Sequence, residues 1–446
     1  MHRITEGTVL FISILKWFVL ASIVGVLIGL STTLFLFLLD KAICFTGQYN
    51  YYYLWLPVAF LLSAVVTKLA PEAEGHGTEK VIEAVHKRGA YIKAAVVPVK
   101  LLSTIITLAC GGSAGKEGPC AQIGGGLASI FANLLRFSHA DRKKLVICGI
   151  SAGFASVFGT PIAGAIFGIE VLFVGGIMYD ILLPSFIAGV TSYQVSSYFG
   201  ATYFYHIIDF VPEFSELFFL KVMLGGIFFG ICALFLIEIM KYARRIADFI
   251  PFQTPAKAVI GGIFMVIMVT STSTSYLGLG LDKIEGFLGG GLAEWWDIIG
   301  KVVFTSVTLS FGGSGGVVTP IFFVGTAAGS FYGQFMGLDP ATFAAIGMVS
   351  LLAGAANTPI AASILAVEMF GSKVAPYAAV ACVTSFLMTG HRSVYPSQVF
   401  AIMKSSSFKK EIGREVEEMQ AEFVLRKKSL IRVVLSVIRK CFRRGG

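Results

Sequence analysis

A glycine-rich segment with one acid and one base offers the clearest chemistry in this sequence. It reads Gly111-Gly-Ser-Ala-Gly-Lys-Glu-Gly-Pro119 and precedes a long apolar run. Pro119 suits the first turn of a helix, where its missing N–H costs nothing, and the preceding glycines let the chain turn sharply. The free N–H groups of a helix start carry about half a positive charge and can hold an anion. We therefore expect an anion site where a helix begins near Glu117.

The second half of the chain repeats this device. Gly315-Gly-Val-Val-Thr-Pro320 has the same glycines and proline but no ionisable side chain. The surrounding sequence also repeats, because Lys100 and Ser113 have the same spacing as Lys301 and Ser314. Two such helix starts that converge would make one anion site.

A further matched pair of motifs supports an internal duplication. Thr-Pro-Ile-Ala occurs at 160–163 and at 358–361, and in each copy a glutamate, Glu170 or Glu368, follows the proline by nine residues. We therefore expect two similar halves, 1–205 and 206–402, and a basic tail, 403–446. Paired halves in a membrane protein are typical of transporters, which hold the substrate where broken helices meet.

The composition places these motifs in a membrane. Of 446 residues, 56% are hydrophobic and 14% charged, and the mean hydropathy is +0.80. A soluble domain of this size needs more charge to cover its surface. Many apolar segments are too short for a straight crossing or contain Gly and Pro, so we expect an all-α, polytopic protein with short, broken helices.

Charge and cysteines exclude several other classes of protein. The net charge of +9 lies mostly in the tail, where twelve Lys or Arg and five Glu follow from Lys404 onward. We expect this tail on the cytoplasmic side, with both termini cytoplasmic and a helix over 426–444 on the inner leaflet. Nucleic acid is not expected as a partner. The seven cysteines are scattered, so we expect no metal site, cofactor or disulfide framework.

The sequence allows two interpretations of the role of Glu117. A carboxyl inside a membrane costs about 2.5–3.5 kcal/mol on insertion scales and tends to be kept only where it works. At a positive helix end the carboxylate would compete with a mobile anion, and its protonation would free the site, which makes it a gate. The alternative is an ordinary N-terminal acid that stabilises its helix.

These motifs together resemble the CLC family of chloride channels and chloride/proton antiporters, over the whole chain to about residue 402. The resemblance implies two inverted repeats of tilted, broken helices in a homodimer, and it makes Glu117 the gating glutamate. It also implies that backbone N–H groups at Val317 and Val318 and the hydroxyl of Tyr395 bind the anion. The full predicted set of anion-binding residues is Gly75, His76, Gly77, Gly115, Lys116, Gly118, Val317, Val318 and Tyr395.

Three positions depart from the family pattern. Where the family has Gly-Ser-Gly-Ile-Pro, this chain has Gly75-His-Gly-Thr-Glu79, so His76 replaces a serine that meets the anion. Its imidazole either donates to the anion or turns toward cytoplasmic water while backbone N–H groups bind. Val318 replaces a phenylalanine and would widen the inner path. Val171 stands where family antiporters often have a second glutamate, which favours a channel slightly.

We therefore expect chloride transport across the plasma membrane, gated by Glu117, with a slight preference for a passive channel. Chloride/proton antiport and fluoride/proton antiport are the alternatives within transport. A membrane-embedded enzyme or scaffold is the alternative of another class, although no nucleophile with a nearby base and no phosphate loop is found. We expect Glu170 and Glu368 to accept backbone N–H groups, and Lys100 and Lys301 to extend toward lipid headgroups.

Overall fold

The computed structural model describes residues 2–203, 205–208, 215–405 and 412–418, and nearly all regular secondary structure within these residues is helical. The helices of the first half are α1 His2–Thr46, α2 Leu56–Thr67, α3 Thr78–Lys87, α4 Val96–Ala109, α5 Glu117–Leu134, α6 His139–Phe158, α7 Pro161–Glu170 and α8 Leu182–Tyr198. Those of the second half are α9 Glu216–Phe249, α10 Thr254–Ser271, α11 Leu281–Leu288, α12 Trp295–Ser310, α13 Val318–Met336, α14 Pro340–Ala356, α15 Pro359–Phe370 and α16 Ala375–Thr389.

Short connecting elements complete the chain. Two strands, β1 Phe173–Val174 and β2 Val399–Phe400, pair in parallel. Five 3₁₀ turns lie at Tyr52–Trp55, Pro71–Ala73, Tyr179–Ile181, Thr274–Tyr276 and Val416–Glu418. Most of the tail, including 426–444, lies outside the described residues.

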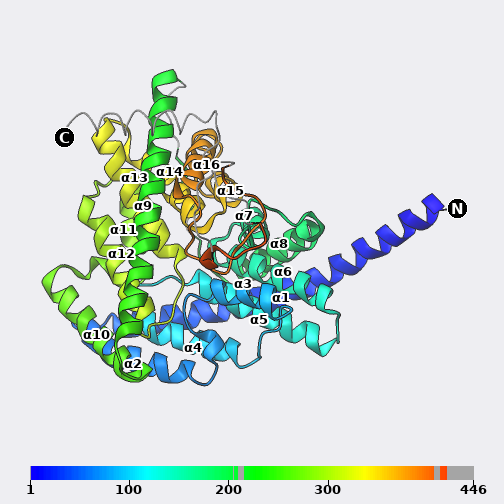
Figure 1. Ribbon diagram of the computed structural model, residues 1–446, viewed down its shortest axis with the longest axis horizontal. Coiled ribbons are helices and arrows are strands. Elements are labelled where there is room, and N and C mark those ends of the chain that lie inside the picture. The colour runs from blue at the N-terminus through cyan, green and yellow to red at the C-terminus, as the bar shows by residue number, and fades with distance from the viewer. Residues whose placement is uncertain (1, 204, 209–214, 406–411, 419–446) are drawn as a thin grey trace, which may run out of the picture.

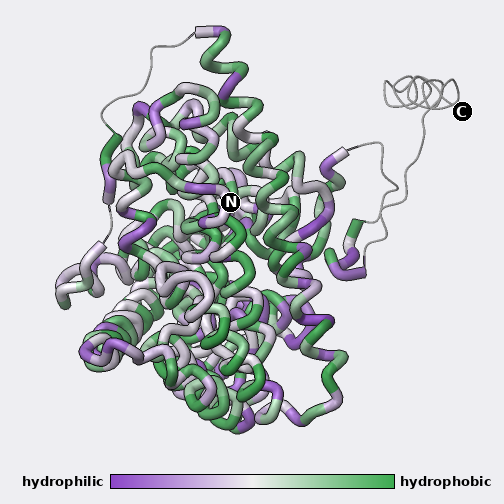
Figure 2. The backbone as a smooth tube through the Cα atoms, turned by 90° about the vertical axis from the view of Figure 1, so that its left-hand side faces the viewer, coloured by the Kyte–Doolittle hydropathy of each residue, from purple (hydrophilic) through white to green (hydrophobic). Residues whose placement is uncertain are grey.

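The expected broken helices are confirmed. Parts of α1, α9 and α10 are long and apolar enough to cross a bilayer, whereas six further apolar helical segments are shorter, down to ten residues in α7. Apolar residues run along the helices, and polar residues gather mainly toward helix ends and connections (Figure 2). The described chain is thus an all-α membrane protein with several segments that end inside the protein.

The two halves lie side by side in Figure 1, the first in blue to teal and the second in green to orange. The series α4 to α8 corresponds to α12 to α16 in order and approximate length. Close backbone crossings also correspond: Gly149 of α6 lies against Gly124 of α5, and Gly347 of α14 lies against Gly325 of α13. A Cβ on any of these glycines would strike the backbone of the facing helix, so small residues allow both crossings.

Two glutamates join the halves reciprocally, as the repeat predicted. Glu170, at the end of α7, accepts the N–H groups of Ile360 (3.1 Å) and Ala361 (2.8 Å) at the start of α15. Glu368, near the end of α15, accepts those of Ile162 (3.0 Å) and Ala163 (2.7 Å) at the start of α7. Each carboxylate therefore satisfies the free donors of the other half's helix.

The segment after α16 returns between the halves toward α3 (Figure 1). Gln398 donates to the carbonyls of Val171 and Ala356, both at 2.8 Å, and so ties together the ends of α7 and α14. Residues 413–418 fold back on this segment, and Glu415 pairs with Lys87 at 2.8 Å. The end of the membrane part is therefore fixed close to α3.

Candidate functional site

The starts of α5 and α13 abut at the centre of the protein. Gly115 donates to the carbonyl of Gly316 at 2.7 Å, and Gly316 donates to that of Gly115 at 2.6 Å. The predicted convergence of the two helix starts is therefore present.

The loops before these helices are held crosswise by the opposite half. The N–H of Ser113 donates to the Thr308 hydroxyl at 3.1 Å, and the N–H of Ser314 donates to the Thr107 hydroxyl at 2.9 Å. The matched Lys-to-Ser segments thus fix the two helix starts relative to each other.

Glu117 crosses this junction and occupies the start of the opposite helix. Its side chain is 2% exposed, and its Oε2 accepts the N–H of Thr319 at 3.1 Å. Its Oε1 accepts the Thr319 hydroxyl in a short hydrogen bond. The carboxylate therefore lies on the positive end of α13, where a mobile anion would be expected. This geometry meets the requirement for a gate that competes with the anion.

The loop before α3 forms a third wall. Gly77 has φ +73°. A Cβ on Gly77 would overlap the backbone of Gly118, and a Cβ on Gly118 would overlap the backbone of His76. Glycine at both positions lets the His76 backbone approach the start of α5 closely. The three segments that resemble family motifs therefore meet at one point.

Lys100 holds this third wall in place. Its ammonium is fully buried and donates to the carbonyls of Gly75 (2.5 Å) and Ala73 (3.1 Å). Lys301 is equally buried and donates to Tyr276 (3.2 Å) and Gly278 (2.8 Å). The expectation that both lysines extend to lipid headgroups is wrong, because their carbonyl partners lie inside the protein.

Two side chains on the segments next to this junction carry a buried polar atom without a protein partner among the described residues. The Tyr395 side chain is fully buried, and neither its hydroxyl nor Nδ1 of His76 has a hydrogen-bond partner within the described chain. The two ring centroids lie 6.2 Å apart. Nδ1 of His76 is inaccessible to solvent, although the residue as a whole is half-buried.

The remaining predicted residues lie around the same point. Val317 precedes α13 and Val318 begins it, and both are 1% exposed. Lys116 precedes α5 and is half-buried. Sequence reasoning missed Thr319, although it stands inside Gly315–Pro320, because an uncharged threonine at a helix start carries no signal that distinguishes it from an ordinary helix residue. It also missed the role of Lys100, whose repeat at Lys301 was the available signal.

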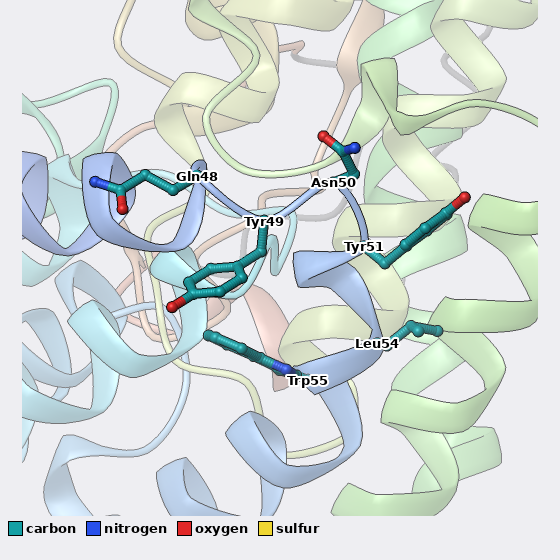
Figure 3. Close-up of a pocket in the computed structure, with 6 residues that line it drawn as sticks. All are labelled: Gln48, Tyr49, Asn50, Tyr51, Leu54 and Trp55. Carbon is teal, nitrogen blue, oxygen red and sulfur yellow. The ribbon is translucent and has the colours of Figure 1, made fainter.

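A separate surface hollow lies on the connection between α1 and α2. Figure 3 shows Tyr49 beside Trp55, with ring centroids 5.2 Å apart, and Tyr51 on the opposite side of the turn. Clusters of Tyr and Trp are typical of the boundary between lipid and water. This hollow lacks charged residues, and we assign it to the membrane interface.

The fold and the junction define a polytopic membrane protein of the CLC type, with two inverted halves around a central site suited to anions. A sequence model of the family described as voltage gated chloride channel matches residues 58–390. The chain belongs to this family, and CLC-type ion transport is its function at that level.

Individual relatives narrow the comparison. The chain is 35% identical over 396 residues to the "Chloride/fluoride channel protein" of Pseudomonas syringae pv. tomato, covering 86% of each sequence. Its fold is similar to that of a CLC-type fluoride/proton antiporter, with a TM-score of 0.83, 27% identity, and 86% and 98% of the two chains covered. A slow cyanobacterial Cl⁻/H⁺ antiporter gives a TM-score of 0.73 at 20% identity, covering 84% and 94%, which shows the shared fold.

Proposed function

We propose that this protein exchanges an anion for a proton and that the transported anion is fluoride. The observation that carries this proposal is the Glu117 carboxylate on the positive start of α13, bonded to both donors of Thr319. A carboxylate and an anion compete for these donors, whereas a protonated carboxyl gives them up. One residue can therefore bind a proton when the anion enters and release it when the anion leaves.

This proposal replaces the slight preference for a passive channel. That preference rested on Val171 alone, a buried residue that cannot carry a proton. The solved relative with 27% identity is a fluoride/proton antiporter, which favours the antiporter alternative. We assign no enzymatic activity to the site.

Fluoride is supported by the donors as well as by the relatives. It is small and strongly hydrated, so its site must replace water with hard donors. The hydroxyls of Tyr395 and Thr319, the imidazole of His76 and backbone N–H groups are of this kind. Chloride is the second candidate, because the 35% identical relative carries both anions in its name.

The test uses the purified full chain in liposomes. A fluoride gradient is imposed with the membrane potential clamped by potassium and an ionophore, and proton and anion fluxes are recorded together. We expect fluoride to drive protons against their gradient, and chloride to drive them less. Fluoride movement without protons would refute antiport, and stronger coupling to chloride would reverse the choice of anion.

Glu117→Gln tests the gate itself. The amide cannot carry a proton, so we expect coupled proton flux to fall by about 100-fold or more and the pH dependence of anion flux to disappear. The exposed Glu285 on α11 supplies the control Glu285→Gln, which should behave as wild type. An unchanged pH profile in Glu117→Gln would remove this residue from the mechanism.

We also propose a homodimer in the plasma membrane, with α3 and the segment after α16 facing the cytoplasm. The basic residues near α3 support that orientation. Ile162 and Ile360 lie at matched helix starts and are each 46% exposed, which supports an apolar interface there. Light scattering in detergent should give twice the chain mass, and tryptophan at both positions should give monomers.

A further inference from the structure

Glu79 carries a buried carboxyl oxygen that the anion site does not account for. It lies in the first turn of α3, and its Oε1 accepts the N–H (3.0 Å) and the hydroxyl (2.5 Å) of Ser397. Its Oε2 is inaccessible to solvent and has no hydrogen-bond partner within the described chain. One carboxyl oxygen is thus held by Ser397, and the other oxygen is buried without a partner among these residues.

The two ordinary roles of such an acid do not fit. A helix cap would accept N–H groups of its own helix, but the bonds of Glu79 run to the segment after α16. A structural ion pair would need a cation, but the neighbouring Lys80 pairs with Glu83 at 3.1 Å, and no ion pair to Glu79 is found within the described residues. A buried, uncompensated carboxylate is costly, so an oxygen in this state is suited to hold a proton.

Glu79 and its partner Ser397 are both close in sequence to residues of the predicted anion site. His76, with its unpartnered Nδ1, stands three residues before it, and Tyr395, with its unpartnered hydroxyl, stands two residues before its partner Ser397. The ring centroids of His76 and Tyr395 lie 6.2 Å apart, so these two residues are neighbours across the segments. The unpartnered groups of His76 and Tyr395 therefore lie on the two segments that Glu79 joins, the loop before α3 and the segment after α16.

We propose that Glu79 is the proton-exchanging carboxyl on the α3 side of the anion site. This inference rests on the proposed antiport. The O–H bond of protonated Glu117 breaks, a proton crosses the site, and an O–H bond forms at Oε2 of Glu79, so the number of protons and the total charge are unchanged. Release from Glu79 then delivers the proton to the face on which α3 lies.

The charges around Glu79 are compatible with reversible protonation. On α3 itself, Lys80 and Glu83 neutralise each other. His76 lies on the preceding loop, which Lys100 of α4 holds through the Gly75 carbonyl, and Tyr395 lies on the segment after α16. Oε2 of Glu79 is left without a partner in the described part of the chain and can accept a proton.

Glu79→Gln in the full chain, assayed in liposomes, tests this role. We expect fluoride-driven proton flux to fall by about 100-fold, because the amide keeps the shape but cannot hold the proton. The Kd for fluoride, measured by calorimetry in detergent, should stay within about threefold of the wild-type value, which is well below the tenfold change that about 1.4 kcal/mol would cause. Glu285→Gln, at an exposed position on α11, is the control and should leave proton flux unchanged.

The outcomes separate the two proposals. If wild type moves no protons, the proposed antiport fails. If wild type moves protons and Glu79→Gln moves them equally well, antiport stands and the role of Glu79 is refuted. Glu79→Asp should restore proton flux at least in part, which a purely structural contact with Ser397 would not require.

A second variant covers the case in which Glu79→Gln does not fold. Ser397→Ala removes one hydroxyl that donates to the charged form of Glu79 and so stabilises that form. The half-maximal pH of proton flux should therefore rise by about one unit or more, since one unit corresponds to about 1.36 kcal/mol. An unshifted pH profile in this variant overturns the proposal.

Discussion

The starts of α5 and α13 are two copies of one device with different chemistry. Both follow a glycine-rich turn, and each donates a backbone bond to the other through Gly115 and Gly316. The α5 copy carries the acid Glu117, whereas the α13 copy carries Thr319, which offers that acid an N–H and a hydroxyl. The repeat thus supplies the convergence of two helix ends, and in the proposed function the unmatched residues supply competition between a carboxylate and an anion.

Other repeated residues differ less from each other. Glu170 and Glu368 form the same pair of bonds across the halves, and Lys100 and Lys301 each donate to two carbonyls. Matched contacts of this kind hold the two halves together and shape the loops. We therefore expect the residues that act in transport to be those whose surroundings differ between the two halves.

The largest difference that we expect between the halves is the effect of their buried lysines on fluoride affinity. Lys100 holds the loop of His76, whereas Lys301 holds a loop at Gly278 and lies over the Phe323 ring at 5.2 Å. A charge several ångströms from an anion is worth about 2 kcal/mol at an effective dielectric constant near 20, or roughly 30-fold in affinity. Lys100→Met should weaken fluoride binding by about that factor, and Lys301→Met should not.

Calorimetric titration of fluoride checks this pair of variants. Both should lower the thermal midpoint in detergent, since each leaves carbonyls without donors. Equal losses of affinity would mean that the lysines act only through folding, and would remove the distinction between the two loops.

Thr319→Val tests the unmatched residue on the α13 side. The N–H remains, but the hydroxyl that holds the Glu117 carboxylate is lost, and a hydrogen bond to a charged group is worth roughly 1.5–3 kcal/mol. Because the carboxylate and the anion compete for this hydroxyl, we expect fluoride to bind about tenfold more weakly at a pH where Glu117 is protonated. Unchanged binding at that pH would show that the hydroxyl serves only the Glu117 carboxylate.

The sequence predicted the architecture of this site better than its contacts. The repeats of 100–113 and 301–314 and the Pro residues at helix starts identified two converging N-termini, because these features depend on local backbone chemistry. The bond from Glu117 to Thr319 joins residues from different halves, and its existence depends on how those halves pack. The same reason explains the wrong placement of Lys100 and Lys301, whose carbonyl partners lie about 25 residues away in the chain.

Replacing the two glutamates that join the halves should have the smallest effect on transport. These variants directly test how the two halves are held together. Glu170 is 4% exposed and Glu368 is half-buried, although their bonds are alike. Replacing either with Gln removes the charge from two hydrogen bonds, so we expect a loss of roughly 2–4 kcal/mol of stability for Glu170→Gln and about half as much for Glu368→Gln. Thermal unfolding in detergent measures this order.

Transport by the same two variants decides whether Glu170 is only structural. The α15 start that Glu170 caps is the counterpart of the α7 start that Glu368 caps, so a purely structural role predicts an unchanged ratio of protons to fluoride in both variants. A folded Glu170→Gln protein with a lower ratio would place this carboxyl on the proton path. It would also show that the difference in burial between two matched residues is enough to turn a structural contact into a functional one.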